Sequence, residues 1–202
     1  MNDLRSTPAY LMRGGTSKGL IFHKKDLPND RNLLTEYLLK IMGSPDIRQI
    51  NGIGGGTSVT SKVCIISKSL EKNVDIDYFF AQVEVDRKHV DYAPTCGNML
   101  SALGPFAIEE GLVETRNEIT QVNVKSINTD AVITLDVPTP DGKLKYSGDF
   151  KIDGVPGTGS QILMNFNNLE GKITGNLFPT GNIVDTFNGC LLYTSPSPRD
   201  KR

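Results

Sequence analysis

Residues 91–110 read Asp-Tyr-Ala-Pro-Thr-Cys-Gly-Asn-Met-Leu-Ser-Ala-Leu-Gly-Pro-Phe-Ala-Ile-Glu-Glu, and this stretch decides the fold. A strand-like segment ends at a Pro-Thr turn, and the run rich in alanine and leucine that follows predicts a helix beginning just after Cys96. Because apolar residues occur nearly all round this helix, we expect sheet to surround it. Pro105 predicts either a kink in the helix or an early break.

The predicted helix places Cys96 at its N-terminus. Unpaired backbone N–H groups and the positive end of the helix dipole favour an anion there, either the thiolate of the cysteine or a substrate carboxylate. The stretch therefore predicts an acid/base site. Considered alone, one cysteine beside an apolar helix is more often a small core residue. Cys64 lies between Val63 and Ile65 in a predicted strand, and we interpret it as such a core residue.

Strand patterns dominate the rest of the chain. They are rich in β-forming residues or alternate, and Gly, Pro, Asn and Asp separate them. The predicted strands are residues 9–13, 20–23, 61–67, 74–85, 120–127, 131–137, 143–148 and 161–166. A second helix is predicted from Arg31 to Met42, with an apolar face that includes Leu34 and Leu38 and with Gly43 as its end. Strands wrapped about a central helix predict an α+β fold.

Composition narrows the class of protein. The 202 residues carry a net charge of −1 and are 38% hydrophobic, enough for one domain with a sizeable core or for one lobe of a larger protein. Without a basic field, we expect no nucleic-acid partner. No apolar run approaches the roughly 20 residues that a membrane helix needs, and the polar N-terminus lacks a signal-peptide core. We therefore expect no membrane partner and a cytoplasmic location.

Metal and disulfide sites are not expected. His23 and His89 have no candidate ligands nearby in the sequence, and the cysteines do not show CxxC spacing. The three cysteines are too few for a disulfide framework.

Two glycine-rich segments precede the cysteine. Residues 12–19 read Met-Arg-Gly-Gly-Thr-Ser-Lys-Gly, and residues 51–62 read Asn-Gly-Ile-Gly-Gly-Gly-Thr-Ser-Val-Thr-Ser-Lys. Glycines permit positive φ and close backbone approach, and the neighbouring hydroxyls and amides can donate to an anion. The first segment lacks P-loop spacing, and the second lacks the βαβ context of a dinucleotide site. Either alone is an ordinary surface turn, but three donor-rich segments in one chain favour a binding site.

Taken together, these motifs resemble the family of 4-oxalomesaconate tautomerases, methylitaconate isomerases and 2-methylaconitate cis–trans isomerases, which has a diaminopimelate epimerase-like fold. The resemblance covers residues 8–187, and the motifs that carry it are residues 12–19, 42–46, 49–62, 80–83 and 96–98. Within it, residues 48–50 and 78–83 look closer to the oxalomesaconate tautomerase branch. The resemblance implies a lobe in which a mostly antiparallel sheet is rolled around a central helix.

The resemblance also implies a chemistry, namely moving a proton and a double bond in a small unsaturated di- or tricarboxylate without a metal or organic cofactor. The first candidate is keto–enol tautomerisation of 4-oxalomesaconate, and the alternatives are isomerisation of 2-methylaconitate or methylitaconate. Cys96 and Lys62 match the positions that the family is thought to use in catalysis. Cys96 as a thiolate is a candidate base; Lys62 is a base if neutral or stabilises developing negative charge if protonated. The sequence does not assign which of the two residues removes the proton.

Substrate carboxylates would be bound by hydroxyl, amide and backbone donors, and two cations are candidates for pairing with them. The implied donors are Ser17, Thr57, Ser58, Gly97 and Asn98, and the cations are Arg13 and Lys18.

Family members are longer and hold the substrate between two similar lobes. The resemblance therefore implies that residues 1–180 form the N-terminal lobe and residues 181–189 begin a truncated second lobe. Residues 190–202 change character abruptly and resemble a translated sequencing adapter, so we interpret them as non-native; the alternative is a disordered Ser/Pro-rich tail. We expect this chain to be inactive alone. A homo-oligomer is one open prediction, and a non-catalytic carboxylate-binding protein is the alternative function.

Overall fold

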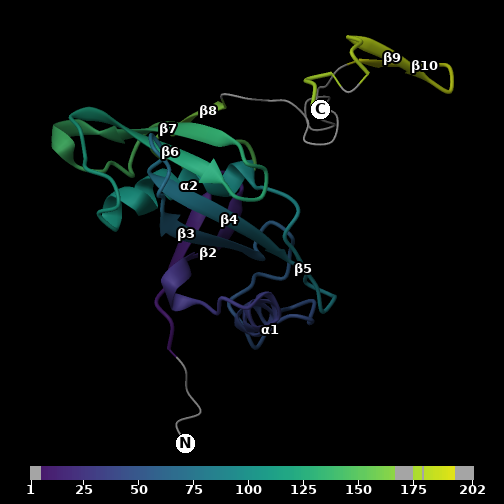
Figure 1. Cartoon of the computed structure of the whole chain (residues 1–202), viewed down its shortest axis with the longest axis horizontal. Helices are drawn as coiled ribbons and strands as arrows, with labels where there is room; N and C mark the ends of the chain where they lie inside the picture. The colour runs from purple at the N-terminus through teal and green to yellow at the C-terminus, as the bar shows by residue number, and fades with distance from the viewer. Residues whose placement is uncertain (1–5, 167–174, 179, 194–202) are drawn as a thin grey trace, which may run out of the picture. The chain divides into compact units, whose positions relative to one another are not determined.

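The computed structural model describes residues 6–166, 175–178 and 180–193, and the chain divides into two compact units, Met1–Phe166 and Asn167–Arg202. The second unit contains a hairpin in which β9 (Val184–Phe187) pairs with β10 (Cys190–Tyr193), drawn in yellow in Figure 1. No strand was expected at β10. The first unit contains every residue predicted to form the site.

An eight-stranded sheet forms the first unit, in the order β1-β2-β3-β4-β6-β7-β8 with β5 paired to β4. The strands are β1 (Tyr10–Gly14), β2 (Ser17–His23), β3 (Lys62–Lys68), β4 (Ile76–Val83), β5 (Val90–Asp91), β6 (Glu118–Ser126), β7 (Val132–Thr139) and β8 (Leu163–Phe166). Within this sheet, β2–β3 and β4–β6 are parallel and the other described pairings are antiparallel. The predicted α+β class with a mostly antiparallel sheet is confirmed.

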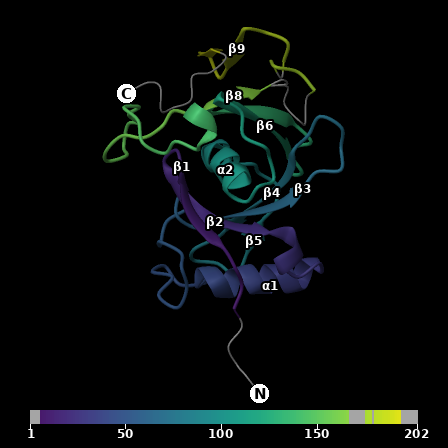
Figure 2. The ribbon, with the colours of Figure 1, turned by 90° about the vertical axis from the view of Figure 1, so that its left-hand side faces the viewer.

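The sheet curls around helix α2 (Gly97–Glu109), which Figure 2 shows inside the curve. Leu100, Leu103 and Phe106 are 0% exposed and belong to a core cluster with residues of β2, β3, β4, β6 and β7. Neither a break nor an early end occurs at Pro105, because the helix continues through it to Glu109. The prediction of a central helix surrounded by sheet is confirmed.

Helix α1 (Arg31–Met42) covers the outer face of the same sheet and has the predicted bounds. Its N-cap, Asp30, accepts hydrogen bonds from the backbone N–H groups of Asn32 and Leu33, both at 2.9 Å. Its C-cap, Gly43, has the left-handed φ of 83° that commonly ends a helix. The buried face packs on β2, β3 and β4 and consists of Leu34, Leu38, Leu39 and Met42.

Short 3₁₀ turns, η1 (Lys24–Asp26) and η2 (Pro140–Gly142), complete the elements of this unit. The strand predicted at residues 143–148 is wrong. Its backbone makes isolated hydrogen bonds, Lys145 N to Pro138 O at 3.2 Å and Ser160 N to Tyr146 O at 2.8 Å, instead of a ladder. Strand propensity depends on finding a paired neighbour, which local sequence does not reveal. The strand-like segment expected before the Pro-Thr turn forms only the two-residue strand β5.

Candidate active site

The β1–β2 hairpin presses against the first turn of α2. Gly14 and Gly15 permit this approach, since a Cβ at Gly14 would lie 2.3 Å from Asn98 O and Gly15 has a φ of +51°. Asn98 Nδ2 donates to Thr16 Oγ1 at 2.8 Å and to Ser17 Oγ at 3.2 Å. The first glycine-rich segment therefore positions the start of the helix, and it brings two predicted substrate-binding residues, Ser17 and Asn98, into contact.

Cys96 is the N-cap of α2, which confirms its predicted place at a helix N-terminus, and it is half-buried. Its carbonyl accepts from Leu100 N at 3.1 Å, but its side chain makes no capping hydrogen bond. A Cβ at Gly97, the next residue, would meet nothing within 4 Å. Space is therefore open beside Gly97 in the first turn of α2, where backbone N–H groups without an intrahelical partner favour an anion, while Cys96 itself packs against the core cluster.

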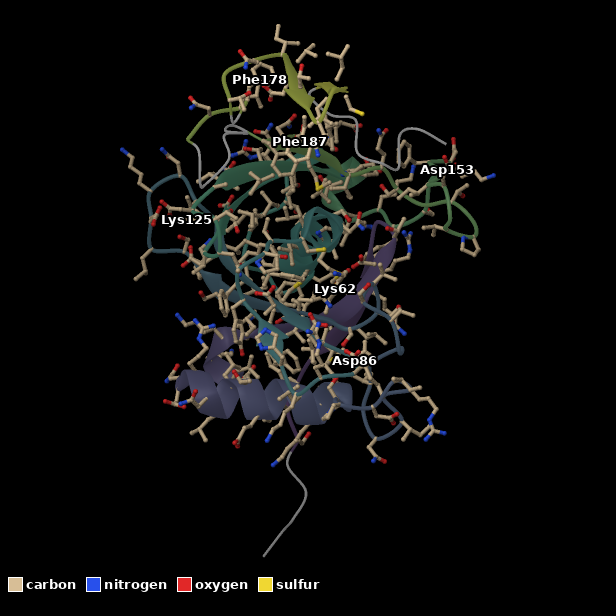
Figure 3. All side chains as sticks on the ribbon, turned by 90° about the vertical axis from the view of Figure 1, so that its right-hand side faces the viewer. Lys62, Asp86, Lys125, Asp153, Phe178 and Phe187 are labelled. Atoms are coloured by element: carbon tan, nitrogen blue, oxygen red, sulfur yellow. The ribbon has the colours of Figure 1, made fainter. Side chains whose placement is uncertain are left out.

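Lys62 begins β3 on the face of the sheet that surrounds α2. Side chains alternate along a strand, and Cys64, two residues on, belongs to the core cluster around α2. Lys62 is nearly buried, at 9% exposed. Its Nζ donates to Gln82 Oε1 at 2.6 Å and lies 5.3 Å from the centroid of the Phe80 ring. No ion pair of Lys62 occurs in the described part of the chain. Figure 3 labels this residue.

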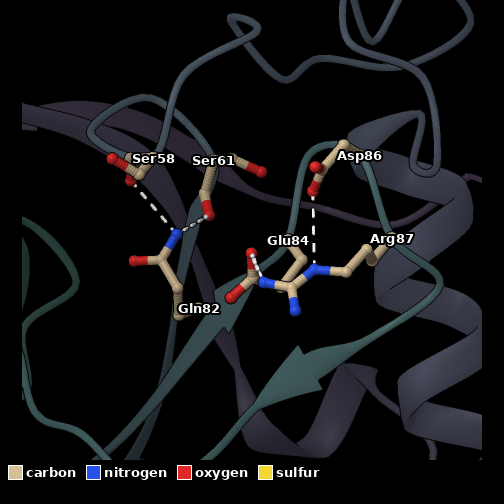
Figure 4. A network of polar contacts seen from close by, with 6 residues as sticks. All are labelled: Ser58, Ser61, Gln82, Glu84, Asp86 and Arg87. Carbon is tan, nitrogen blue, oxygen red and sulfur yellow. Dashed lines mark hydrogen bonds and ion pairs between the residues drawn. The ribbon is translucent and has the colours of Figure 1, made fainter.

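Gln82 orients Lys62 and joins it to the second glycine-rich segment. Its Nε2 donates to the carbonyls of Ser58 at 3.1 Å and Ser61 at 3.0 Å, as Figure 4 shows. The amide oxygen is thereby left to face Lys62 Nζ. Sequence reasoning recorded Gln82 in a family motif but assigned it no role. Its place two residues after Phe80, on the same face of β4, is the signal that could have found it.

Thr57 and Ser58 lie on an exposed loop that reaches the site through backbone contacts. The carbonyl of Ser58 accepts from Gln82, and Lys18 N donates to Val59 O at 2.9 Å. Thr57 Oγ1 shares a 2.8 Å hydrogen bond with Thr60 Oγ1 inside the loop. The structure therefore brings this loop to Lys62, while the substrate contacts predicted for the two hydroxyls stay predictions.

Gln49 supports the loop through buried hydrogen bonds; it lies in a family motif, but no role was predicted for it. It is 1% exposed, and its Nε2 donates to Ser61 Oγ at 2.7 Å and to Ser44 Oγ at 3.1 Å. Its Oε1 accepts from Gly56 N at 2.9 Å. A polar residue just before a glycine-rich segment gives no sequence signal of burial.

Electrostatics place the two predicted catalytic residues around one buried thiol, that of Cys64. Burial raises the pKa of Cys64, the nearby Cys96 raises it further, and the Tyr78 hydroxyl and Lys62 act in the opposite direction. Cys64 is 0% exposed, which confirms it as a core residue and keeps it protonated at neutral pH. Cys64 follows Lys62 by two residues on the same face of β3, and Cys96 packs against the core cluster that contains Cys64, so both predicted catalytic residues lie near this thiol although they are far apart in sequence.

A cavity of about 280 Å³ runs along α2 on the side that the sheet leaves open, between the edge strands β1 and β8. Its polar lining includes Arg13, Asn98, Ser101, Lys145, Tyr146 and Ser160, with no carboxylate among the lining residues. Two cations and several neutral donors suit a small anion. Arg13 Nη1 donates to Gly15 O at 2.8 Å, so the loop of the β1–β2 hairpin holds one of these cations at the cavity.

Residues 6–166, 175–178 and 180–193 contain no group of three His, Cys, Asp or Glu side chains placed to hold a metal ion. His23 Nε2 instead lies 2.6 Å from Glu110 Oε2. In the same residues, no helix has the length and apolar character needed to cross a membrane.

Comparisons with known proteins identify the family of this chain. The family model described as PrpF protein matches residues 4–192. The 4-oxalomesaconate tautomerase of Pseudomonas putida is 49% identical over 182 residues, 90% of this chain and 50% of that protein. The (4E)-oxalomesaconate Delta-isomerase of Novosphingobium is 48% identical over 187 residues, 93% of this chain and 52% of that protein.

The fold has a close counterpart among solved structures. The crystal structure of a methylitaconate-delta-isomerase superposes with a TM-score of 0.83 at 45% identity, over 90% of this chain and 47% of that one. The chain spans about half the length of the curated relatives it matches. The match to the family model over nearly the whole chain confirms the predicted family: the chain belongs to the PrpF protein family.

Proposed function

We propose that this chain is the N-terminal lobe of a cofactor-independent isomerase that acts on a small unsaturated di- or tricarboxylate. The observation that carries the proposal is Cys96, half-buried at the open N-terminus of α2 and in the same neighbourhood as Lys62. A thiol and an amine, both able to exchange protons, thus lie near a helix terminus that favours anions.

The reaction breaks one C–H bond and forms another bond to hydrogen, with no net change in atoms or electrons. A base removes a proton from the carbon next to a carbonyl or allylic to a carboxylate, and the C–H electron pair becomes part of the shifted double bond. An acid then returns a proton to carbon or, in a keto–enol step, to oxygen. Charge that develops on the substrate oxygens needs preorganised donors.

Cys96 and Lys62 would act as the base and acid of this reaction. Gln82 holds Lys62 Nζ through a neutral amide oxygen, 2.6 Å away. When the amine is protonated, no carboxylate compensates its charge; when it is neutral, it is free to accept a proton. The backbone N–H groups of Gly97 and Asn98 would receive a substrate carboxylate, and the Ser17 hydroxyl, held by Asn98, would lie next to it.

Among substrates, 4-oxalomesaconate is our first candidate. The relatives named for oxalomesaconate are 48–49% identical to this chain, which supports this choice over 2-methylaconitate and methylitaconate. Arg13, in the cavity beside Asn98, is a candidate partner for a further carboxylate of the substrate.

The second lobe would supply the other wall of the site, so we expect this chain to be inactive alone. Residues 1–180 would form the first lobe and residues 181–189 the start of the second, with residues 190–202 of non-native origin. A direct check is the DNA that follows codon 189 in the source genome: an open frame encoding a second lobe supports this division, and a stop codon after Arg202 contradicts it.

The activity is best tested in a chimera in which residues 4–189 replace the matching half of the Pseudomonas putida tautomerase. Deuterium from D₂O is followed into 4-oxalomesaconate by proton NMR, with 2-methylaconitate and methylitaconate as competing substrates. Because a positioned acid or base contributes about 10²–10⁴-fold, we expect Cys96→Ser and Lys62→Gln each to lose that much exchange. Asp30→Ala, at the N-cap of α1, is the control and should exchange normally.

Two results would contradict the proposal. Substrate binding without exchange in the unsubstituted chimera would favour the alternative of a non-catalytic carboxylate-binding protein. Full exchange in Cys96→Ser would remove the cysteine from the mechanism even if the protein is an isomerase.

A further inference from the structure

Tyr78 has a buried hydroxyl group whose presence the packing of the fold does not explain. The side chain lies on β4 between Ile76 and Phe80, faces the core around α2 and is 0% exposed. In the described part of the chain its Oη has no hydrogen-bond partner. A buried polar group without a partner is costly, and a phenylalanine would fill the same space without that cost. The hydroxyl therefore calls for an explanation other than packing.

The surroundings of this hydroxyl point toward Cys96. Burial raises the pKa of Tyr78, and the thiols of Cys64 and Cys96 raise it further. The backbone N–H of Cys96 acts in the opposite direction, so it too lies close to the phenol, although outside hydrogen-bond geometry. Cys96, the N-cap of α2, also packs against the core cluster that contains Tyr78, so the hydroxyl and this residue are neighbours in the core.

The neighbouring groups leave Cys96 as the strongest acceptor available. Cys64, on β3, lies close enough to the hydroxyl to interact with it, but outside hydrogen-bond geometry, and as a fully buried neutral thiol it is a weak acceptor. Lys62, also on β3, is a donor that already contacts Gln82. The first turn of α2 contains no acidic residue. A thiolate at Cys96 would be an anionic acceptor, and hydrogen bonds to ionised groups are the strong ones.

We propose that Tyr78 is a positioning residue for Cys96, its hydroxyl donating a hydrogen bond to the Cys96 sulfur once that sulfur has given up its proton. Tyr78 keeps its own proton throughout, because its pKa is raised. The hydroxyl is unpartnered while Cys96 is a thiol and gains its acceptor when the thiolate forms. Only the catalytic role of this hydrogen bond rests on the proposed function. The contact itself lies within this chain and can be tested without the reaction.

The test measures the alkylation of Cys96 by iodoacetamide against pH in the 202-residue chain, with mass spectrometry separating Cys96 from Cys64 and Cys190. A hydrogen bond to a charged group is expected to shift a titration by about one to two pH units. We therefore expect Tyr78→Phe to move the alkylation midpoint of Cys96 upward by about that amount. Exposed Cys190 should not change, and it serves as the internal control.

Tyr92→Phe is the matched control variant. It also removes one phenolic hydroxyl, but that hydroxyl hydrogen-bonds Thr35 Oγ1 at 2.9 Å, away from Cys96. Its Cys96 midpoint should equal that of the unsubstituted chain. The thermal midpoint of Tyr78→Phe should stay the same or rise, because the substitution removes an unpartnered polar group.

An unchanged Cys96 midpoint in Tyr78→Phe would overturn the proposal, as would an equal shift in Tyr92→Phe. If Tyr78→Phe does not fold, global replacement of tyrosine by 3-fluorotyrosine decides the matter. Fluorine makes the phenol a stronger donor at nearly constant shape, so the midpoint should move downward, and no movement contradicts the proposal. None of these readings needs a substrate, so they remain valid even if Cys96→Ser proves that the proposed reaction is wrong.

Discussion

The two helices of the first unit differ in how they begin. The N-terminus of α1 is closed by Asp30, whose side chain accepts from two backbone N–H groups. The N-terminus of α2 has Cys96 as its cap, with no side-chain hydrogen bond and open space beside Gly97. Capping a helix saturates the groups that would otherwise bind an anion. The cap of α1 thus stabilises the fold, whereas the uncapped N-terminus of α2 supports the proposal that a ligand binds there.

The helices differ equally in what surrounds them. α1 packs one face on the sheet and leaves residues such as Leu33, at 58% exposed, in solvent. α2 lies inside the curl of the sheet and is apolar nearly all round. An open N-terminus needs rigid support, since no cap stabilises it, and the enclosing sheet provides that support.

Cavity substitutions should separate the two helices most strongly. Leu103 in α2 and Leu38 in α1 are both 0% exposed. Changes of this type cost about 2–5 kcal/mol, depending on how far the surroundings can collapse. We expect Leu103→Ala to fall near the upper end, because α2 is enclosed, and Leu38→Ala near the lower end, because α1 can settle onto the sheet. Urea unfolding followed by circular dichroism measures both, and equal losses would break the comparison.

Two glycines test how tightly α2 is held along its length. A methyl group at Gly104 would lie 2.5 Å from Val137 Cγ2, whereas one at Gly97 would meet nothing within 4 Å. Overpacking costs about 1–3 kcal/mol, so Gly104→Ala should be destabilised by that amount. Gly97→Ala should gain up to about 1 kcal/mol, because alanine favours the helix. Thermal melts of both variants check this, and a destabilised Gly97→Ala would mean that the N-terminus is not open.

The caps should give opposite effects of about 1 kcal/mol. Asp30→Ala removes two hydrogen bonds at the start of α1 and should cost about 1 kcal/mol. Cys96→Ser supplies α2 with a favoured N-cap residue and should gain up to about 1 kcal/mol. In the chimera, however, Asp30→Ala should keep deuterium exchange and Cys96→Ser should lose it. A loss of stability in Cys96→Ser would argue that the sulfur is needed for packing.

The smallest effect is expected at the other end of α2. There Glu110 accepts from Tyr10 and pairs with His23, and these two hydrogen bonds, that of Tyr10 first, lower the pKa of Glu110. A carboxyl with a lowered pKa in the folded state stabilises the fold above its unfolded pKa and loses that contribution as pH falls through the folded pKa. Because the pair is partly exposed, we expect less than about 1 kcal/mol.

Glu110→Gln should therefore be less stable than the unsubstituted chain at neutral pH, and the gap should close as pH falls below about 4.3, the ordinary glutamate pKa. Urea titrations at several pH values measure it. A gap that persists at low pH would point to packing of Glu110 instead of its charge.

Much of the fold could be predicted because local patterns were complete. Helix α1 shows an N-cap, an apolar face and a C-cap glycine in sequence order, so its bounds were correct from Arg31 to Met42. The strand predicted at residues 143–148 failed, since alternation suggests a strand but cannot supply the neighbour that completes its ladder.

The candidate site could be predicted only in part. Cys96 and Lys62 were found through motif resemblance, and Cys96 also through its place before an apolar helix. Gln49, Tyr78 and Gln82 were given no role, because a polar residue reveals its partners only after strands and loops distant in sequence have been brought together.

The amino-acid sequence by itself determined the family, the α+β class, the central helix and the cysteine at its start, because each depends on order and periodicity along the chain. Only the tertiary structure decided that Lys62 is oriented by Gln82 and that Tyr78 lies beside Cys96 with an unpartnered hydroxyl. The physical reason is that these contacts join separate elements, β3, β4 and α2, whose register and distance are set by the packing of the whole core.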